Sequence, residues 1–136
     1  MNRGGINIWA VLVAAVVYWL LGAAWFTIFS NAWLASIGKT MEQLQGAVNA
    51  GIAYSIALVC NLIIAYVLGW VVIRTGEQTA VRGITIGALL WVGLVGTTIG
   101  TAFIFEGRSL EGFVLTAGYP LVGMLVMGAI VGGWKK

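Results

Sequence analysis

Few side chains in this sequence are of the types that perform acid–base, nucleophilic or metal chemistry. The 136 residues include no His, a single Cys at position 60 and four carboxylates. Glu106, Arg108 and Glu111 lie close together, and two carboxylates at this spacing could exchange protons with a substrate. No nucleophile, phosphate-binding loop or metal-ligand pattern accompanies them, which favours a solvated loop. Without His, His-based catalysis and most metal sites are excluded. The sequence predicts no catalytic residue, no metal and no cofactor, and it favours a protein that is not an enzyme.

A second group of side chains could bind a ligand without ionising. Its members are aromatic, hydroxyl or amide residues within otherwise apolar stretches: Trp25, Tyr54, Asn61, Thr97, Thr98, Thr101 and Tyr119. Aromatic rings with a few orienting hydrogen-bond groups suit an uncharged or amphipathic molecule. The alternative is that these residues join neighbouring helices, where each hydrogen bond contributes about 0.6 kcal/mol. The sequence leaves both interpretations open.

Two positions in these stretches need hydrogen-bond partners from elsewhere. Asn61 lies near the middle of its apolar stretch, and the hydroxyls of Thr97 and Thr98 are candidate partners. Pro120 has no N–H, so within a helix it frees the carbonyl of Thr116. A kink with a nearby hydroxyl is well tolerated in a membrane helix. We therefore expect a bend at Pro120.

The elements that position these residues are membrane-spanning helices. Hydrophobic residues make up 61% of the chain and charged residues 8%, whereas soluble domains carry about 25% charged residues. The seven basic and four acidic residues all lie outside four apolar runs: 6–29, 52–73, 84–105 and 113–134. Each run exceeds the roughly 20 residues that a helix needs to cross hydrocarbon. Backbone groups in lipid must be paired internally, so the runs are expected to be helical. The sequence predicts an all-α membrane protein, a single four-transmembrane-helix domain.

The charge distribution excludes two broad functions. No ionisable Asp, Glu, Lys, Arg or His lies within a run, although such residues mark proton relays and ion-coupled pathways. A drug/proton antiporter of the small multidrug resistance type needs an embedded carboxylate, so proton-coupled export is not expected. The basic residues are also scattered, without the clustering that nucleic-acid binding requires.

Orientation follows from the Lys and Arg residues that flank the runs. One side carries five of them: Arg3, Arg74, Arg82, Lys135 and Lys136. The opposite side carries two, Lys39 and Arg108. The excess predicts cytoplasmic termini. Because successive helices cross in opposite directions, most of the aromatic, hydroxyl and amide residues named above then lie in the half of the membrane that faces away from the cytoplasm.

The segment between the first two runs has structure of its own. Thr40 and Gln43 have the spacing of a capping box, in which both side chains bond exposed backbone amides. Met41, Leu44 and Val48 follow at helical spacing. The pattern predicts a short amphipathic helix, lying on the membrane surface or simply linking the first two spans.

Glycines at four-residue spacing favour close helix packing. The sequence contains Gly83/Gly87, Gly96/Gly100 and Gly128/Gly132 pairs. Those selected for helix packing are Gly93, Gly96, Gly100, Gly128 and Gly132, and we expect the third span to be the packing centre. The partner could be this chain or another copy. Because four helices enclose little interior, a homo-oligomer surrounded by membrane lipids is expected.

A set of Gly and Trp positions along the chain forms a recognisable pattern. It comprises Leu21-Gly22-Ala23-Ala24-Trp25-Phe26, Asn31-Ala32-Trp33, Gly38-Lys39-Thr40-Met41-Glu42, Trp91-Val92-Gly93, Gly118-Tyr119 and Gly132-Gly133-Trp134. This pattern resembles the bacterial membrane family catalogued as domain of unknown function 1761 over nearly the whole chain. Phe26 departs from the Tyr more frequent there, and the usual following Pro is missing. The resemblance implies a small four-helix bacterial membrane protein. It implies no particular biochemical activity.

Together these patterns predict a multi-pass protein of the bacterial inner membrane. The leading hypothesis is that it binds or passes an uncharged or lipid-like molecule through its outer half. The alternative is a non-catalytic scaffold or accessory subunit for another membrane protein.

Overall fold

Helices are the regular elements of the computed structural model, which describes residues 5–135. Three long α-helices are α1 (Ile8–Ile28), α4 (Ala50–Arg74) and α7 (Leu110–Gly133). The fourth rod, Ala80–Phe105, joins α5 (Ala80–Leu90), a π-helix η1 (Trp91–Gly96) and α6 (Thr97–Phe105). All four are long and apolar enough to cross a membrane, which confirms the predicted fold class. The π-helical turn was not predicted. Arg3 and Lys136, used in the charge count, lie outside the described residues.

Polar caps fix where the long helices begin. The side chains of Asn7, Asn49, Thr79 and Ser109 each accept a hydrogen bond from a backbone amide in the first turn of the helix that follows. Such caps satisfy N–H groups that have no partner within the helix. Each cap lies within five residues of the start of a predicted apolar run, so hydropathy and capping specify similar boundaries.

Two short helices connect α1 to α4: α2 (Ser30–Ile37) and α3 (Met41–Ala47). The predicted capping box at the start of α3 is confirmed. The Gln43 amide donates to Thr40 Oγ1 at 3.2 Å, and the Thr40 amide donates to Gln43 Oε1 at 2.9 Å. Helix α2 was not predicted. It ends at Gly38, whose φ of 67° lies in the left-handed region that glycine adopts readily.

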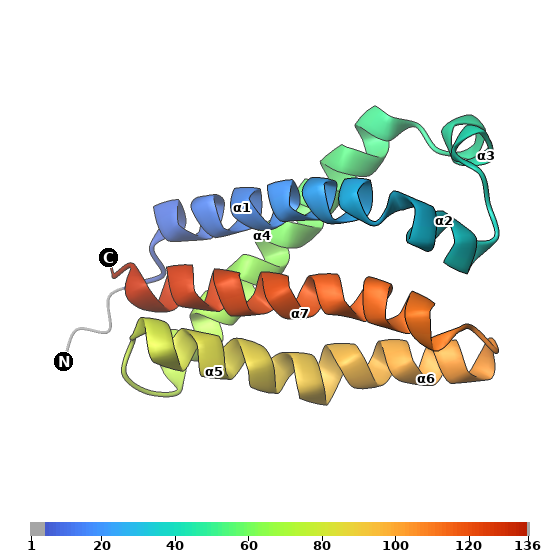
Figure 1. Cartoon of the computed structure of the whole chain (residues 1–136). Helices are drawn as coiled ribbons and strands as arrows, with labels where there is room; N and C mark the ends of the chain where they lie inside the picture. Colours follow the sequence, from blue (N-terminus) through green and yellow to red (C-terminus); the bar gives the residue numbers. More distant parts are fainter. Residues whose placement is uncertain (1–4, 136) are drawn as a thin grey trace.

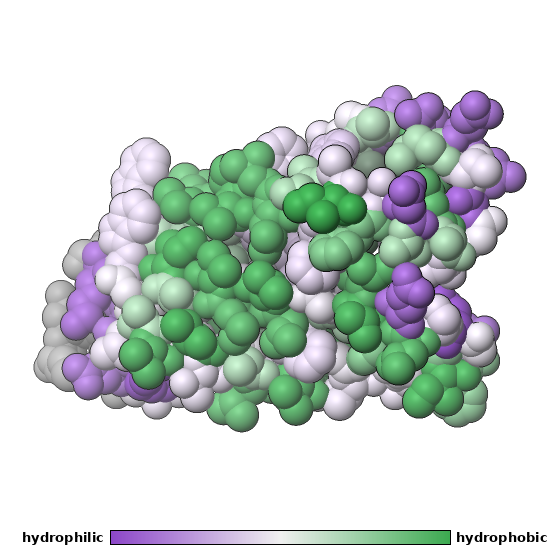
Figure 2. Space-filling view, in the orientation of Figure 1, coloured by the Kyte–Doolittle hydropathy of each residue, from purple (hydrophilic) through white to green (hydrophobic). Residues whose placement is uncertain are grey.

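The rods run roughly along one direction, except α4, which crosses the others obliquely (Figure 1). The chain enters and leaves at the same end of the molecule, opposite α2 and α3. Figure 2 shows a broad hydrophobic surface across the middle, with hydrophilic residues gathered toward the two ends. This distribution suits a protein whose middle faces lipid and whose ends face water.

The core lies between α1, α4 and α7. Its most deeply buried side chains include Ala14, Leu68, Val72 and Met127. In the most apolar window of α7, 39% of residues are buried, against 11% in that of Ala80–Phe105. The expectation that the third span is the packing centre was therefore wrong, and α7 occupies that position.

Helices α5 and α7 meet along a seam of glycines. A methyl group added to Gly83 would overlap the carbonyl oxygen of Gly128, and one added to Gly128 would overlap that of Gly83. Gly87 faces the backbone of Met124 in the same way, and Gly132 faces the carbonyl oxygen of Thr79. The backbones therefore touch without intervening side chains, as small residues at this spacing permit.

The other glycines selected for helix packing have different surroundings. Gly96 lies under the ring of Trp91 from its own rod. A methyl on Gly100 would meet the Phe113 ring at ordinary contact distance, 3.4 Å. Gly93 faces open space: among the described residues, no side chain and no backbone of another helix lies within 4 Å of an added methyl. Close backbone contact in this rod therefore belongs to its α5 part.

The guanidinium group of Arg82 forms three hydrogen bonds across the turn between α4 and α5. Arg82 donates to the carbonyl oxygen of Val72 at 3.0 Å and to that of Glu77 at 2.6 Å. It also donates to the Thr75 hydroxyl at 2.8 Å. Val72 lies in the last turn of α4, where carbonyls lack helical partners and a positive charge is favourable.

Candidate functional site

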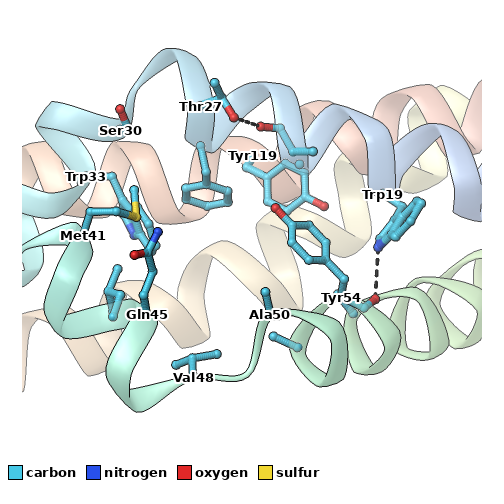
Figure 3. A pocket seen from close by; sticks show the side chains of 16 residues that line it. Trp19, Thr27, Ser30, Trp33, Met41, Gln45, Val48, Ala50, Tyr54 and Tyr119 are labelled. Atoms are coloured by element: carbon cyan, nitrogen blue, oxygen red, sulfur yellow. Dashed lines mark hydrogen bonds between the residues drawn. The ribbon is translucent and has the colours of Figure 1, made fainter.

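A cavity of about 500 Å³ lies between α1 and α4 at the end of the molecule opposite the termini. We call it the α1–α4 pocket; α2 and α3 border it (Figure 3). It is lined by Trp19, Gly22, Ala23, Phe26, Thr27, Ser30, Trp33, Met41, Leu44, Gln45, Val48, Ala50, Ala53, Tyr54, Ala57 and Tyr119. The lining is mainly aromatic and aliphatic, and it contains no charged side chain.

Each bordering element contributes a distinct part of this lining. Small residues on α4, Ala53 and Ala57, leave space beside α1. Met41, Leu44 and Val48 line the side formed by α3 and the residue that follows it. The apolar face predicted from their spacing is thus turned toward the pocket.

Several polar groups of the pocket are bonded to nearby backbone. The Trp19 indole N–H on α1 donates to the carbonyl oxygen of Tyr54 on α4 at 3.0 Å, and the Trp19 and Tyr54 rings meet edge to face. The Thr27 hydroxyl donates to the carbonyl oxygen of Ala23, one turn earlier in α1, at 2.6 Å. These bonds hold this part of the lining in place and occupy the Trp19 and Thr27 donors.

Tyr119 of α7 closes the inner end of the pocket. Its hydroxyl donates to the carbonyl oxygen of Tyr18 at 3.1 Å, and the two rings lie 4.5 Å apart. Glycines admit both rings: a methyl on Gly22 would reach within 2.5 Å of the Tyr119 hydroxyl, and one on Gly123 would overlap the Tyr18 ring. In Figure 3, Tyr54 points from α4 toward Tyr119.

Asn61 lies next to this tyrosine, deeper in the bundle. It is one turn beyond Ala57 on α4 and only 6% exposed, and the Tyr119 hydroxyl is the polar group within hydrogen-bonding reach of its side chain. Its Nδ2 is buried and has no hydrogen-bond partner within the part of the chain that the structure describes. A buried amide nitrogen in this state is costly and calls for an explanation.

Comparison with known families gives a match over almost the entire chain. Residues 9–132 match the model of the family described as "Protein of unknown function (DUF1761)". The chain belongs to the DUF1761 family. The matched region includes all of the pocket residues and most of every rod. Neither the curated proteins nor the solved structures contain a match to this DUF1761 protein.

The structure places the predicted site residues of this DUF1761 protein in three locations. Tyr54 and Tyr119 line the α1–α4 pocket, and Asn61 lies beside it. Trp25 lies against α7, where its indole N–H donates to the carbonyl oxygen of Leu115 at 3.1 Å. The remaining three, Thr97, Thr98 and Thr101, lie exposed on α6.

These threonines do not supply the partner that Asn61 lacks. The hydroxyl of Thr97 donates to the Gly93 carbonyl oxygen at 3.1 Å, and that of Thr98 donates to the Leu94 carbonyl. A helical hydroxyl can bond the carbonyl one turn earlier in this way. The expected bond from α6 to Asn61 is therefore not formed.

Two indoles bond to carbonyl oxygens of α7 that precede Pro120 by three and five residues. Trp25 donates to Leu115, and Trp91 donates to the carbonyl oxygen of Ala117 at 2.9 Å. These carbonyls flank that of Thr116, which loses its helical partner because Pro120 has no N–H. The helix continues through Pro120. Trp25 thus acts here as a link between α1 and α7.

Sequence reasoning missed much of the lining. Trp19, Phe26 and Trp33 line the pocket but were not among the predicted site residues. One pattern could have indicated the site: the apolar face of Met41, Leu44 and Val48 needed a surface to cover. Its partner surface on α1 and α4 becomes visible only when the helices are assembled.

Proposed function

We propose that this protein binds an uncharged amphipathic or lipid-like molecule in the α1–α4 pocket. The observation that carries the proposal is the cavity itself. Its volume of about 500 Å³ falls within the roughly 300–1,000 Å³ of small-molecule sites. Its aromatic and aliphatic lining, with uncharged polar groups, would stabilise an apolar body and orient a neutral head. A charged ligand would find no counter-charge there.

The surroundings of the pocket support a ligand rather than loose packing. The pocket is a recess that opens at the surface of the bundle, so a molecule can enter it from outside. Here, large side chains stand around the space instead of filling it: Trp19, Phe26, Trp33 and Tyr54. Helix α3 adds an apolar wall from outside the four rods. A molecule dissolved in the membrane would be a suitable occupant.

Filling the pocket tests the proposal directly. Ala57→Phe should abolish retention of small molecules through purification in mild detergent, because the ring would occupy the cavity. Ala102→Phe is the matched control, since Ala102 is exposed on α6 and remote from the pocket. Native mass spectrometry, with chromatography of the extracted molecules, measures retention and counts the copies of the chain, testing the predicted homo-oligomer. Equal retention by both variants would contradict the proposal.

We further propose that the protein lies in the inner membrane with cytoplasmic termini and with the pocket in the outer half. The proposal rests on the excess of Lys and Arg at the end that carries the termini and the α4–α5 turn. It predicts different labelling at two exposed positions, Glu77 and Glu106.

Single-cysteine variants measure this orientation. In a Cys60→Ser background, a membrane-impermeant maleimide added to intact spheroplasts should label Glu106→Cys and leave Glu77→Cys unlabelled. Lysis should make both reactive, which controls for access to each thiol. Labelling of Glu77→Cys alone before lysis would reverse the orientation, and labelling of both would indicate two orientations.

A further inference from the structure

The polar groups that line the α1–α4 pocket differ in whether they are already bonded. The Trp19 indole N–H and the Tyr119 hydroxyl each donate to a backbone carbonyl oxygen, so neither is free to donate to a ligand. Ser30, Trp33 and Gln45 also line the pocket, but their side chains form no hydrogen bond with any residue that the structure describes. A ligand in the pocket would therefore find free hydrogen-bonding groups on these three side chains.

The three free side chains lie on one side of the pocket. Ser30 and Trp33 belong to α2, and Gln45 belongs to α3. Figure 3 shows them together on the side bordered by these two helices, with Trp19 on the opposite side. Helices α2 and α3 form one of the two hydrophilic ends of the molecule (Figure 2). Tryptophan is enriched at the depth of the lipid head groups, so this side of the pocket suits the polar end of an amphipathic molecule.

The chemistry of these groups indicates which head group they would bind. An indole N–H only donates a hydrogen bond, whereas a hydroxyl and a side-chain amide both donate and accept. Hydroxyl groups on a ligand match such a set, because each can accept from one side chain and donate to another. Lys39 and Glu42, the charged residues nearest to this side in the sequence, do not line the pocket. An ionised head group would therefore be removed from water without a counter-charge, which is unfavourable.

We infer that the ligand of this pocket is a single-chain lipid with a neutral, hydroxylated head group, of the monoacylglycerol type. Its head lies beside α2 and α3, and its chain points inward toward Trp19 and Tyr119. This inference rests on the proposed function. The small side chains of Ala53 and Ala57 leave room for the chain, and a volume of about 500 Å³ suits one acyl chain rather than two. The Tyr54 hydroxyl, which is also unbonded, points into the pocket and is available to an ester carbonyl.

A pair of probes that differ only in their hydroxyl groups tests the head group. Glycerol monododecanoate and propyl dodecanoate share the acyl chain, the ester and a propyl skeleton, and the glyceride adds two hydroxyls. Purified protein in detergent micelles is equilibrated with each probe and re-isolated. Liquid chromatography with mass spectrometry measures the amount retained relative to protein-free micelles. The wild type should retain the glyceride about five-fold more tightly than the propyl ester, as expected for one net hydrogen bond.

Variants then locate the head group. Gln45→Leu should retain propyl dodecanoate as the wild type does and reduce the glyceride preference to less than about two-fold, because the amide is lost while the apolar wall remains. Trp33→Phe, which removes the indole N–H and keeps an aromatic ring, should also lower the preference. Asn31→Leu is the matched control, since Asn31 is exposed on α2 and does not line the pocket, and it should keep the five-fold preference. Thermal unfolding of each variant shows whether it is folded.

The outcomes separate this inference from the proposed function. Equal retention of the two probes by the wild type would overturn the inferred head group and leave the pocket as a binding site. A glyceride preference that survives in both Gln45→Leu and Trp33→Phe would overturn the placement of the head beside α2 and α3. If neither probe exceeds its level in protein-free micelles and Ala57→Phe changes nothing in native mass spectra, the proposed function itself is contradicted. The comparison of probes in the wild type needs no variant, so it decides the head group even if a variant fails to fold.

Discussion

Gly83→Ala is expected to lower the free energy of unfolding by about 3 kcal/mol, the upper end of the range for overpacking a core. The added methyl would overlap the carbonyl oxygen of Gly128 on α7. Backbone atoms cannot rotate away as a side-chain end can, so the two helices must separate. Separation would also loosen the contacts of Gly87 and Gly132 along the same seam. Gly128→Ala should have an effect of similar size, because its methyl would meet the Gly83 carbonyl.

The matched control is Gly93→Ala in the same rod. An added methyl there meets no side chain and no other helix within 4 Å among the described residues. This variant should be as stable as the wild type or slightly more stable, because Ala has a higher helix propensity than Gly. Thermal unfolding in mild detergent, followed by tryptophan fluorescence and by size-exclusion chromatography, measures the difference. Equal stability of Gly83→Ala and Gly93→Ala would show that α5 and α7 do not meet at this seam.

Arg82→Met is expected to lower the free energy of unfolding by about 2 kcal/mol. Its guanidinium makes three hydrogen bonds across the α4–α5 turn, to Val72, Glu77 and Thr75. Hydrogen bonds to a charged group contribute about 1.5–3 kcal/mol when buried. Arg82 is half-buried, and solvent screening reduces the total. The end of α4 would be destabilised most, because its last carbonyl oxygens would then have to accept hydrogen bonds from water.

Arg82→Lys distinguishes the contribution of the positive charge from that of the guanidinium hydrogen bonds. A lysine keeps the positive charge near the end of α4, but it lacks the planar fork that reaches three acceptors at once. It should lose about half as much stability as Arg82→Met, or about 1 kcal/mol. Lys39→Met, at an exposed position between α2 and α3 at the opposite end of the molecule, should be neutral. A fully stable Arg82→Met protein would mean that the turn is held by other contacts.

The two ends of the molecule are therefore built differently. At the end with the termini, glycine backbones touch and a guanidinium fastens the turn, leaving no space between α5 and α7. At the other end, α4 diverges from α1 and two short helices cover the gap, which becomes the α1–α4 pocket (Figures 1 and 3). A bundle that is tight at one end can hold a space open at the other.

Much of the fold could be predicted from local sequence. Hydropathy placed four helices because lipid cannot satisfy an unpaired backbone, and Thr40 with Gln43 marked the start of α3 because both bonds form within four residues. The glycine pairs were visible as well, but their partners were not. Gly83 and Gly96 have the same spacing to a second glycine, yet one meets another helix and the other lies under its own Trp91.

The site could be predicted only in part. Tyr54, Asn61 and Tyr119 stand out because polar atoms in an apolar run must be paired, and that requirement is local. Which atom pairs with which was decided by the tertiary structure. Thr97 and Thr98 bond their own helix, whereas the Tyr119 hydroxyl reaches α1. The sequence by itself determined four helices long and apolar enough to span a membrane, the capping box of α3 and an uncharged interior, since each depends on residues close along the chain. Only the tertiary structure decided where backbones touch, where a pocket remains and that Asn61 lies beside Tyr119, because these depend on how the helices cross.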